Sequence, residues 1–213
     1  MDLEIFHEIW DYERYTPSAI REVASGGVVV DIGAHIGLFS VFAAKTLNPK
    51  QMICVEPISQ NFELLCKNIS NNHIEDVRTF EVAIAGQSGD RRIGIDPFNS
   101  GGHSLVDRRG YGQLVRGITI QDLFDSANVS DCTLLKMDCE GAEMEILEKA
   151  SDQLLARISA ICFEYHLDTY AKEHLTQLQN RLEAIGFLCK VQPTTYTLGI
   201  FYGINRIRIP RYD

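Results

Sequence analysis

Residues 28–37, with the sequence VVVDIGAHIG, decide the fold of this 213-residue chain. Three consecutive valines favour a buried strand, and this strand runs into the carboxylate of Asp31. Gly33 and Gly37 then permit tight turning and close approach of a ligand to the main chain, before an apolar helix begins at Leu38. In an open α/β sheet, a turn of this kind lies at the carboxyl ends of the strands, where ligands bind. The stretch therefore predicts a ligand-binding turn.

The spacing of the glycines indicates the kind of ligand. A turn that binds pyrophosphate has the pattern G-x-G-x-x-G, with free main-chain amides facing the phosphates. Here His35 stands where the second glycine would be, and Asp31 precedes the first. An anion repels pyrophosphate but attracts an ammonium group. The pattern D-x-G-x-x-x-G therefore favours a ligand with a cationic amino-acid end, such as S-adenosylmethionine. A buried strand that ends in a plain glycine turn is the alternative.

Length and composition fit a single globular domain over residues 1–213, with an N-terminal helical segment at 1–27 and a core at 28–213. Hydrophobic residues make up 45% of the chain and charged residues 23%, which is ordinary for a globular protein. No apolar run approaches the roughly 20 residues of a membrane span. The acidic N-terminus lacks the basic start and apolar core of a signal peptide. We expect a cytoplasmic protein that has no membrane partner.

The charge and the cysteines exclude two further classes. A formal net charge of −9 argues against a protein that mainly holds a nucleic-acid backbone, because phosphate contacts need clustered lysine and arginine. The six cysteines show no C-x-x-C pairing, and several lie in or beside apolar strand-like runs. They are typical of reduced core thiols rather than of a zinc site or a disulfide framework. Oligomeric state leaves no signal in the sequence.

Strand-like and helix-like patterns alternate along the chain. After the first strand, strands are expected at residues 52–57, 77–84, 91–96, 104–107, 132–138, 158–164, 187–191 and 198–204. Helices are expected at residues 17–25, from 38, from 59, from 120, at 143–151 and at 170–185. Such alternation predicts right-handed crossovers and an α/β fold with a parallel sheet covered on both faces. A short turn between the last two strands predicts a hairpin that makes one strand antiparallel.

Three segments carry a resemblance to a known family. In order, residues 30–40 (VDIGAHIGLFS), 55–57 (VEP) and 135–143 (LKMDCEGAE) resemble the signatures of the FkbM family of S-adenosylmethionine-dependent methyltransferases. The resemblance spans residues 28–166. It implies a single Rossmann-like class I methyltransferase domain, with a seven-stranded, mostly parallel sheet and an antiparallel last strand. It also implies methyl transfer to oxygen, often on sugars or polyketide-type natural products. His35 departs from the asparagine common at its position in the family.

The expected cofactor site follows the first three strands. Glu56 ends the second strand, where its carboxylate can accept hydrogen bonds from both hydroxyls of a ribose. Near the end of the third strand, Ala83 and its small apolar neighbours offer a surface for an adenine ring. An ordinary strand-end carboxylate and close helix packing are the respective alternatives. The predicted cofactor-binding residues are Asp31, Gly33, His35, Gly37, Glu56, Pro57, Ala83 and Asp138.

Asp138 and Glu164 are the candidate catalytic pair. Both end apolar strands at the same predicted edge of the sheet, so that the two carboxylates face one another across a substrate cleft. They either bind a divalent metal such as Mg²⁺, which lowers the pKa of a substrate hydroxyl, or Asp138 contacts only the amino group of the cofactor without a metal. His166 is a candidate general base or third metal ligand, because imidazole titrates near neutral pH. A partly buried structural histidine is its alternative.

For two neighbouring features, the sequence does not distinguish a structural role from a functional one. Glu140 and Glu143 lie where the first turn of a helix favours carboxylates, although they belong to the family-like segment. The glycine-rich loop at 99–103 is a candidate lid or a plain connection, and His103 within it is a remote candidate base.

The function that these features favour is an S-adenosylmethionine-dependent O-methyltransferase that acts on a hydroxylated small molecule, such as a sugar or natural product. Two alternatives remain. One is an N-methyltransferase, although the Asn/Asp-Pro-Pro-aromatic segment of many amino-group methylases is missing after Asp138. The other is a cofactor-binding module that has lost its chemistry.

Overall fold

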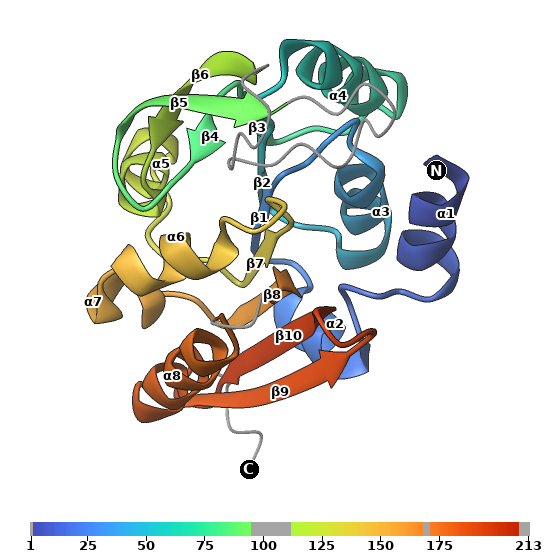
Figure 1. The fold of residues 1–213 in the computed structure, drawn as a ribbon. Helices are drawn as coiled ribbons and strands as arrows, with labels where there is room; N and C mark the ends of the chain where they lie inside the picture. Colours follow the sequence, from blue (N-terminus) through green and yellow to red (C-terminus); the bar gives the residue numbers. More distant parts are fainter. Residues whose placement is uncertain (1, 95–111, 168–170, 209–213) are drawn as a thin grey trace.

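The computed structural model describes residues 2–94, 112–167 and 171–208 and contains a central seven-stranded sheet (Figure 1). The strand order is β3-β2-β1-β7-β8-β10-β9. These strands are β1 (Val28–Ile32), β2 (Gln51–Val55), β3 (Val77–Phe80), β7 (Leu134–Met137), β8 (Ala160–His166), β9 (Phe187–Pro193) and β10 (Leu198–Asn205). The first five are parallel, and β10 runs antiparallel to both β8 and β9. The predicted fold class, including its antiparallel last strand, is confirmed.

Helices cover both faces of this sheet (Figure 1). On one side lie α1 (Asp2–Phe6), the π-helix η1 (His7–Asp11), α2 (Ser18–Ala24), α3 (Leu38–Leu47) and α4 (Ser59–Asn71). On the other side lie α5 (Ile120–Ala127), α6 (Glu143–Lys149), α7 (Asp152–Leu155) and α8 (Ala171–Ala184). Among the described residues, no helix is both long enough and apolar enough to cross a membrane.

The two faces of the sheet build two separate apolar cores. Val28 and Val30 in β1 pack with α5 to α8, whereas Val29 packs with α2, α3 and α4. This split follows from the two-residue period of a strand, and all five residues of β1 are buried. By the same period, Asp31 in β1 points to the α3 face. All six cysteines are free, and Cys54, Cys132 and Cys162 are fully buried, as expected for core thiols.

One predicted strand proves to be two. Residues 77–84 divide into β3, which follows β2 only as far as its end at Val55, and β4 (Ala83–Ile84), which pairs instead with β6 (Gly112–Ile118). With β5 (Gly89–Gly94), these two form a second sheet in the order β4-β6-β5. The sequence pattern does not predict β6, and β5 overlaps the strand expected at 91–96. The strand expected at 104–107, the loop at 99–103 and His103 lie outside the described residues.

Candidate functional site

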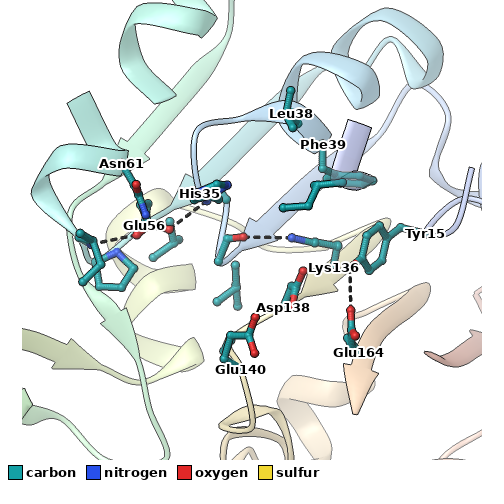
Figure 2. A pocket seen from close by; sticks show the side chains of 18 of the residues that line it. Tyr15, His35, Leu38, Phe39, Glu56, Asn61, Lys136, Asp138, Glu140 and Glu164 are labelled. Atoms are coloured by element: carbon teal, nitrogen blue, oxygen red, sulfur yellow. Dashed lines mark hydrogen bonds between the residues drawn. The ribbon is translucent and has the colours of Figure 1, made fainter. Parts of the chain in front are cut away.

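A cavity of about 480 Å³ opens at the carboxyl ends of the parallel strands. Its walls come from the turn after β1, the residues after β2 and β7, and the N-terminal segment at residues 4–15 (Figure 2). We call the side formed by Gly33, His35, Glu56 and Pro57 the turn end. The opposite side is the carboxylate end, and it comprises Tyr15, Asp138, Glu140 and Glu164. Ala83 also lines the cavity.

The turn end owes its shape to three left-handed residues. Gly33 has φ +73°, His35 +51° and Gly37 +88°. A Cβ atom on Gly33 would lie 1.8 Å from the main-chain oxygen of Asp138, so that only glycine fits where the turn passes the end of β7. The N–H groups of Gly33 and Ala34 donate to the oxygen of Val55 at 3.0 and 2.9 Å. The turn is therefore fastened to β2 through its main chain.

Glu56 projects into the cavity from the end of β2 and is held by main-chain donors. Its Oε2 accepts the N–H of His35 at 2.9 Å, and its Oε1 accepts the N–H of Ile58 at 3.0 Å. Burial raises the pKa of this carboxyl to about 7, although those two N–H groups favour the charged form. An ionised carboxylate has about four acceptor positions. Glu56 can thus accept further hydrogen bonds from a vicinal diol in the cavity.

Asp31 does not line the cavity, which argues against the predicted direct contact with a ligand's ammonium group. Its side chain is fully buried. The Oδ1 atom lies 3.0 Å from Nζ of Lys136, and Oδ2 accepts the hydroxyl of Ser40 at 2.7 Å. Register explains the pairing, because Asp31 and Lys136 are direct neighbours on β1 and β7. Both carboxylate oxygens of Asp31 are therefore engaged by other side chains of the protein.

Lys136 is a cavity residue that the sequence pattern does not predict. Lys136 lines the cavity, and its Nζ donates to the oxygen of Gly33 at 3.1 Å and lies 5.2 and 5.5 Å from the ring centres of Tyr15 and Phe39. Burial alone lowers the pKa of this ammonium, but the Asp31 carboxylate outweighs burial and the pKa lies above its ordinary value. A lysine inside an otherwise apolar strand was the available signal, because a buried charge needs a partner.

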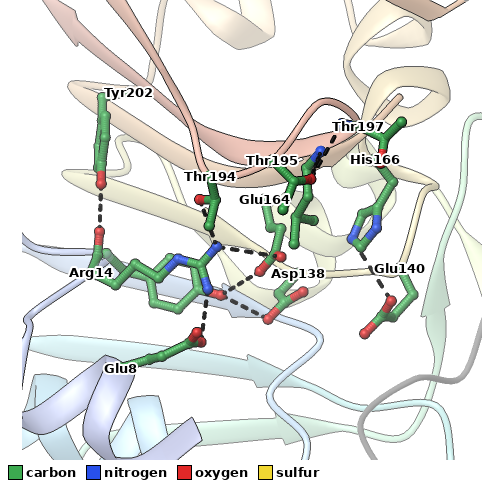
Figure 3. Close-up of polar contacts among 12 residues, drawn as sticks. Glu8, Arg14, Asp138, Glu140, Glu164, His166, Thr194, Thr195, Thr197 and Tyr202 are labelled. Atoms are coloured by element: carbon green, nitrogen blue, oxygen red, sulfur yellow. Dashed lines mark hydrogen bonds and ion pairs between the residues drawn. The ribbon is translucent and has the colours of Figure 1, made fainter. Parts of the chain in front are cut away.

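The carboxylate end brings Asp138 and Glu164 together around a third residue. The phenol of Tyr15 lies 2.9 Å from Oδ2 of Asp138 and 3.3 Å from Oε2 of Glu164. Arg14 approaches from the same segment, with Nη2 at 3.5 Å from Oε1 of Glu164 and Nη1 at 2.8 Å from Oε2 of Glu8 (Figure 3). Burial and Asp138 raise the pKa of Glu164 to about 7, against the effect of Arg14. No local pattern in the sequence marks Arg14 or Tyr15.

His166 lies beyond this pair and does not line the cavity. Its Nε2 is 3.7 Å from Oε2 of Glu140, and burial lowers the pKa of the imidazole. Glu140 does line the cavity, and burial together with Asp138 raises its pKa to about 8. The neighbouring Glu143 is buried and accepts the N–H groups of Gly141, at 2.9 Å, and of Cys139. Glu143 thus has the structural role of shaping the loop after β7.

The geometry argues against the magnesium alternative at Asp138 and Glu164. Across residues 2–94, 112–167 and 171–208, no group of three or more His, Cys, Asp or Glu side chains is arranged to hold a metal ion. Oxygens of the pair instead contact Tyr15 and Arg14, which compete with a cation for the same lone pairs. Mg²⁺ prefers near-octahedral coordination by oxygen, and two partly engaged carboxylates supply little of it.

Comparisons with known proteins agree with the fold. Residues 31–189 match the family described as Methyltransferase FkbM domain. Methyltransferase sdnD of Sordaria araneosa is 23% identical over an alignment of 181 positions, and the match covers 70% of this chain and 69% of that protein. Hexuronic acid methyltransferase AglP of Haloferax volcanii is 24% identical over 154 residues, which cover 72% of this chain and 62% of that protein.

Two solved structures are similar in fold. A methyltransferase FkbM from Methylobacillus flagellatus KT has a TM-score of 0.56 at 17% identity, covering 84% of this chain and 44% of that one. An rRNA methylase from Streptococcus thermophilus also has a TM-score of 0.56, at 12% identity, covering 87% of this chain and 91% of that one. At such identities the likeness concerns the fold alone.

Proposed function

The chain belongs to the FkbM family of S-adenosylmethionine-dependent methyltransferases, and from this premise we propose that it methylates a hydroxyl oxygen of a small molecule such as a sugar or natural product. One observation carries the proposal. A single cavity has the carboxylate of Glu56 at its turn end and a pair of carboxylates, Asp138 and Glu164, at its other end. The first suits a methyl donor, and the second suits an acceptor that must lose a proton.

The cavity as a whole fits S-adenosylmethionine in size, and its turn end fits it in chemistry. A volume of about 480 Å³ lies within the range of roughly 300–1,000 Å³ that is common for small-molecule sites. Glu56 accepts the ribose hydroxyls, while Pro57 and Ala83 form the wall for the adenine. Gly33, His35 and Gly37 shape the turn. Because Asp31 is engaged by Lys136, Asp138 is the carboxylate that receives the amino group of the donor.

Glu164 is the proposed proton acceptor. When bound, S-adenosylmethionine supplies a methyl carbon attached to a sulfonium leaving group. Glu164 takes the proton of the acceptor hydroxyl while the oxygen–carbon bond forms and the carbon–sulfur bond breaks, with its electron pair left on sulfur. A base whose pKa lies near 7 suits this step at neutral pH. His166 stands outside the cavity and receives no proton in this scheme.

The oxygen acceptor is supported by the chemistry of the site and by one relative. An alcohol is a poor nucleophile at neutral pH, and the carboxylate end offers a base to activate it. The name of the hexuronic acid methyltransferase indicates a sugar-derived substrate for that protein. For this chain, the sugar or natural-product acceptor is part of the proposal.

Labelled methyl transfer tests the proposal. The protein is incubated with methyl-labelled S-adenosylmethionine and a panel of monosaccharides, hexuronic acids, nucleosides, hydroxylated natural products and RNA, and the methylated atom is identified by NMR. We expect an O-methyl product from a small molecule. Label on nitrogen or on RNA would overturn the proposed acceptor. Absence of transfer together with retained binding of S-adenosylhomocysteine by calorimetry would indicate a cofactor-binding module that has lost its chemistry.

Two variants assign the ends of the cavity. Glu164→Gln should lower kcat by about 10²- to 10⁴-fold, the usual contribution of a general base, and leave the affinity for S-adenosylhomocysteine unchanged. Glu56→Ala should weaken that affinity by about 1–3 kcal/mol, because charged acceptors of hydroxyl groups are lost. Unchanged affinity in Glu56→Ala would remove this residue from the donor site.

A further inference from the structure

Tyr15 comes from a part of the chain that the family match does not cover. It lies between η1 and α2, whereas the match begins at residue 31. Its side chain is nonetheless buried at the carboxylate end of the cavity, with only 4% of its surface exposed. The phenol oxygen is within hydrogen-bond distance of both Asp138 and Glu164, and Figure 2 labels all three residues. This residue is therefore well placed to act on the proposed catalytic pair.

Packing fixes the ring of Tyr15 independently of its hydroxyl. The ring meets Phe39 edge to face, with ring centres 5.7 Å apart and planes at 75°. Nζ of Lys136 lies 5.2 Å from the same ring centre, within the range of a cation–π interaction. These contacts come from β7 and α3, so that the hydroxyl is aimed at the carboxylates by groups that do not touch it.

The hydroxyl of Tyr15 has a single hydrogen to donate, yet two carboxylates, Asp138 and Glu164, lie within hydrogen-bond distance of it. It donates to Asp138, the closer of the two at 2.9 Å, while its oxygen stays 3.3 Å from Glu164. One rigid side chain thus contacts both carboxylates, and its oxygen limits how closely Glu164 can approach Asp138. We propose that Tyr15 is a positioning residue that sets the base Glu164 against the donor-binding Asp138; this rests on the proposed function.

The charged groups around the pair complete the arrangement. Arg14 contacts the other oxygen of Glu164 at 3.5 Å, so that this carboxylate is held from two sides. Glu140 faces the pair from the loop after β7, and Glu8 faces Arg14 from η1. Methyl transfer requires the acceptor oxygen, the methyl carbon and the sulfur to be in line. By fixing base and donor site together, Tyr15 favours that alignment.

Tyr15→Phe tests this role because it removes only the hydroxyl and keeps the ring contacts. With methyl-labelled S-adenosylmethionine and the panel alcohol that the wild type methylates fastest, kcat should fall by about 10- to 100-fold, the cost of a misplaced reacting group. KM for the alcohol and the affinity for S-adenosylhomocysteine should stay within about twofold, because binding uses other groups. An unchanged kcat would overturn the inference.

Tyr202→Phe is the matched control. The phenol of Tyr202 donates to the main-chain oxygen of Arg14 at 2.7 Å, so that its removal loosens the same N-terminal segment without touching either carboxylate. We expect kcat to stay within about twofold of the wild type in this variant. If Tyr202→Phe lowers kcat as much as Tyr15→Phe does, general loosening of the segment explains both losses and the positioning role is wrong.

A double-mutant cycle separates positioning of the base from an independent effect. If Tyr15 acts through Glu164, Tyr15→Phe should slow the Glu164→Gln enzyme by no more than about twofold, because no base remains to be positioned. Multiplication of the two single losses in the double variant would contradict the inference.

A substrate-free measurement keeps the inference distinct from the proposed function. The Raman difference spectrum of wild type minus Tyr15→Phe isolates the Tyr15 ring doublet, whose intensity ratio reports whether the phenol donates strongly. We expect a strong donor, and a weaker one in Asp138→Asn. A phenol that does not donate would overturn the role of Tyr15 even if methyl transfer is found. If the panel gives no methylated product, the proposed function fails while this spectrum still decides the contact.

Discussion

At the turn end of the cavity, main-chain N–H groups hold Glu56, whereas at the carboxylate end side chains hold one another. The contacts of Glu56 join residues at most 21 positions apart in the sequence. Those of Tyr15 span 123 positions to Asp138 and 149 to Glu164. A hydrogen bond from a main-chain N–H group persists through most substitutions. A hydrogen bond from a side chain is lost when a substitution removes the one atom that makes it. The turn end therefore depends on backbone shape, and the carboxylate end depends on residue identity.

Lys136 joins the two ends, and its loss should have the largest effect. Lys136→Met leaves the fully buried Asp31 carboxylate without its counter-ion and should lower the free energy of unfolding by about 3–5 kcal/mol in urea denaturation. The added substitution Asp31→Asn should restore most of this stability, because the buried charge is then gone. A double variant as unstable as Lys136→Met would show that Lys136 stabilises something other than Asp31.

Substitution of Gly33 by alanine tests whether the turn end depends on backbone shape. Gly26 is the matched control, because its φ of +70° resembles the +73° of Gly33 but open space surrounds it. Gly26→Ala should cost about 1–2 kcal/mol for the left-handed backbone alone. Gly33→Ala should cost about 1–3 kcal/mol more, because the new methyl meets the main-chain oxygen of Asp138. Urea unfolding of both variants measures the difference; equal losses would refute the steric argument.

The pH dependence of donor binding distinguishes Glu56 from the other carboxyls. In the proposed donor site, a pKa of about 7 means that the ribose hydroxyls meet a mostly protonated Glu56 at low pH, so affinity for S-adenosylhomocysteine should rise with pH and level off above 7. One pH unit below this pKa, the affinity should be about tenfold lower. Calorimetry across this range checks the slope, and Glu56→Gln should remove it. A pH-dependence that survives in Glu56→Gln would assign it to another group.

The stability of the protein should respond to pH in the opposite direction. Glu56, Glu140, Glu143 and Glu164 all have folded-state pKa values of about 7 to 8, above the ordinary value of 4.5. The folded state thus binds more protons than the unfolded state, and the contribution of these groups to stability is complete below about pH 4.5. It is lost as the pH rises through 7 to 8. Urea unfolding at several pH values should show this fall; a rise would contradict it.

The smallest effect is expected from a chelator. Because oxygens of Asp138 and Glu164 are engaged by Tyr15 and Arg14, methyl transfer should change by no more than about twofold in excess EDTA. Loss of activity in the chelator and recovery of activity with Mg²⁺ would support a metal ion at the carboxylate end after all. The rate of methyl-labelled product formation is the measurement.

The sequence predicted the turn end far better than the carboxylate end, and the reason is physical. Near β1 and β2, local chemistry sets the structure: β-branched residues favour strand, and Gly33 and Gly37 adopt conformations that other residues disfavour. The division of residues 77–84 into β3 and β4 was missed because their apolar residues suit either sheet. Only the end of β2 at Val55 decides where β3 stops.

Tertiary contacts explain why other site residues were missed. Lys136 looked like part of a buried apolar strand, and its charge is accommodated only because the register places Asp31 beside it. Tyr15 gave no periodic signal, since its role depends on strands far along the chain. In contrast, Asp138 and Glu164 were predicted to meet because parallel strands end at one edge of a sheet. Whether the pair performs the chemistry stays a prediction until the variants are measured.

The long reach of Tyr15 also fixes the order in which the site becomes complete during synthesis. A ribosome that has released residues 1–137 has already supplied β1, β2, β7 and the whole turn, but not Asp138 or Glu164. The nascent chain then holds Tyr15 without either of its hydrogen-bond partners. Because such distant pairings form late and slowly, we expect the turn end to take shape before the carboxylate end closes. The half that carries the proposed base would then be the last part of the cavity to mature.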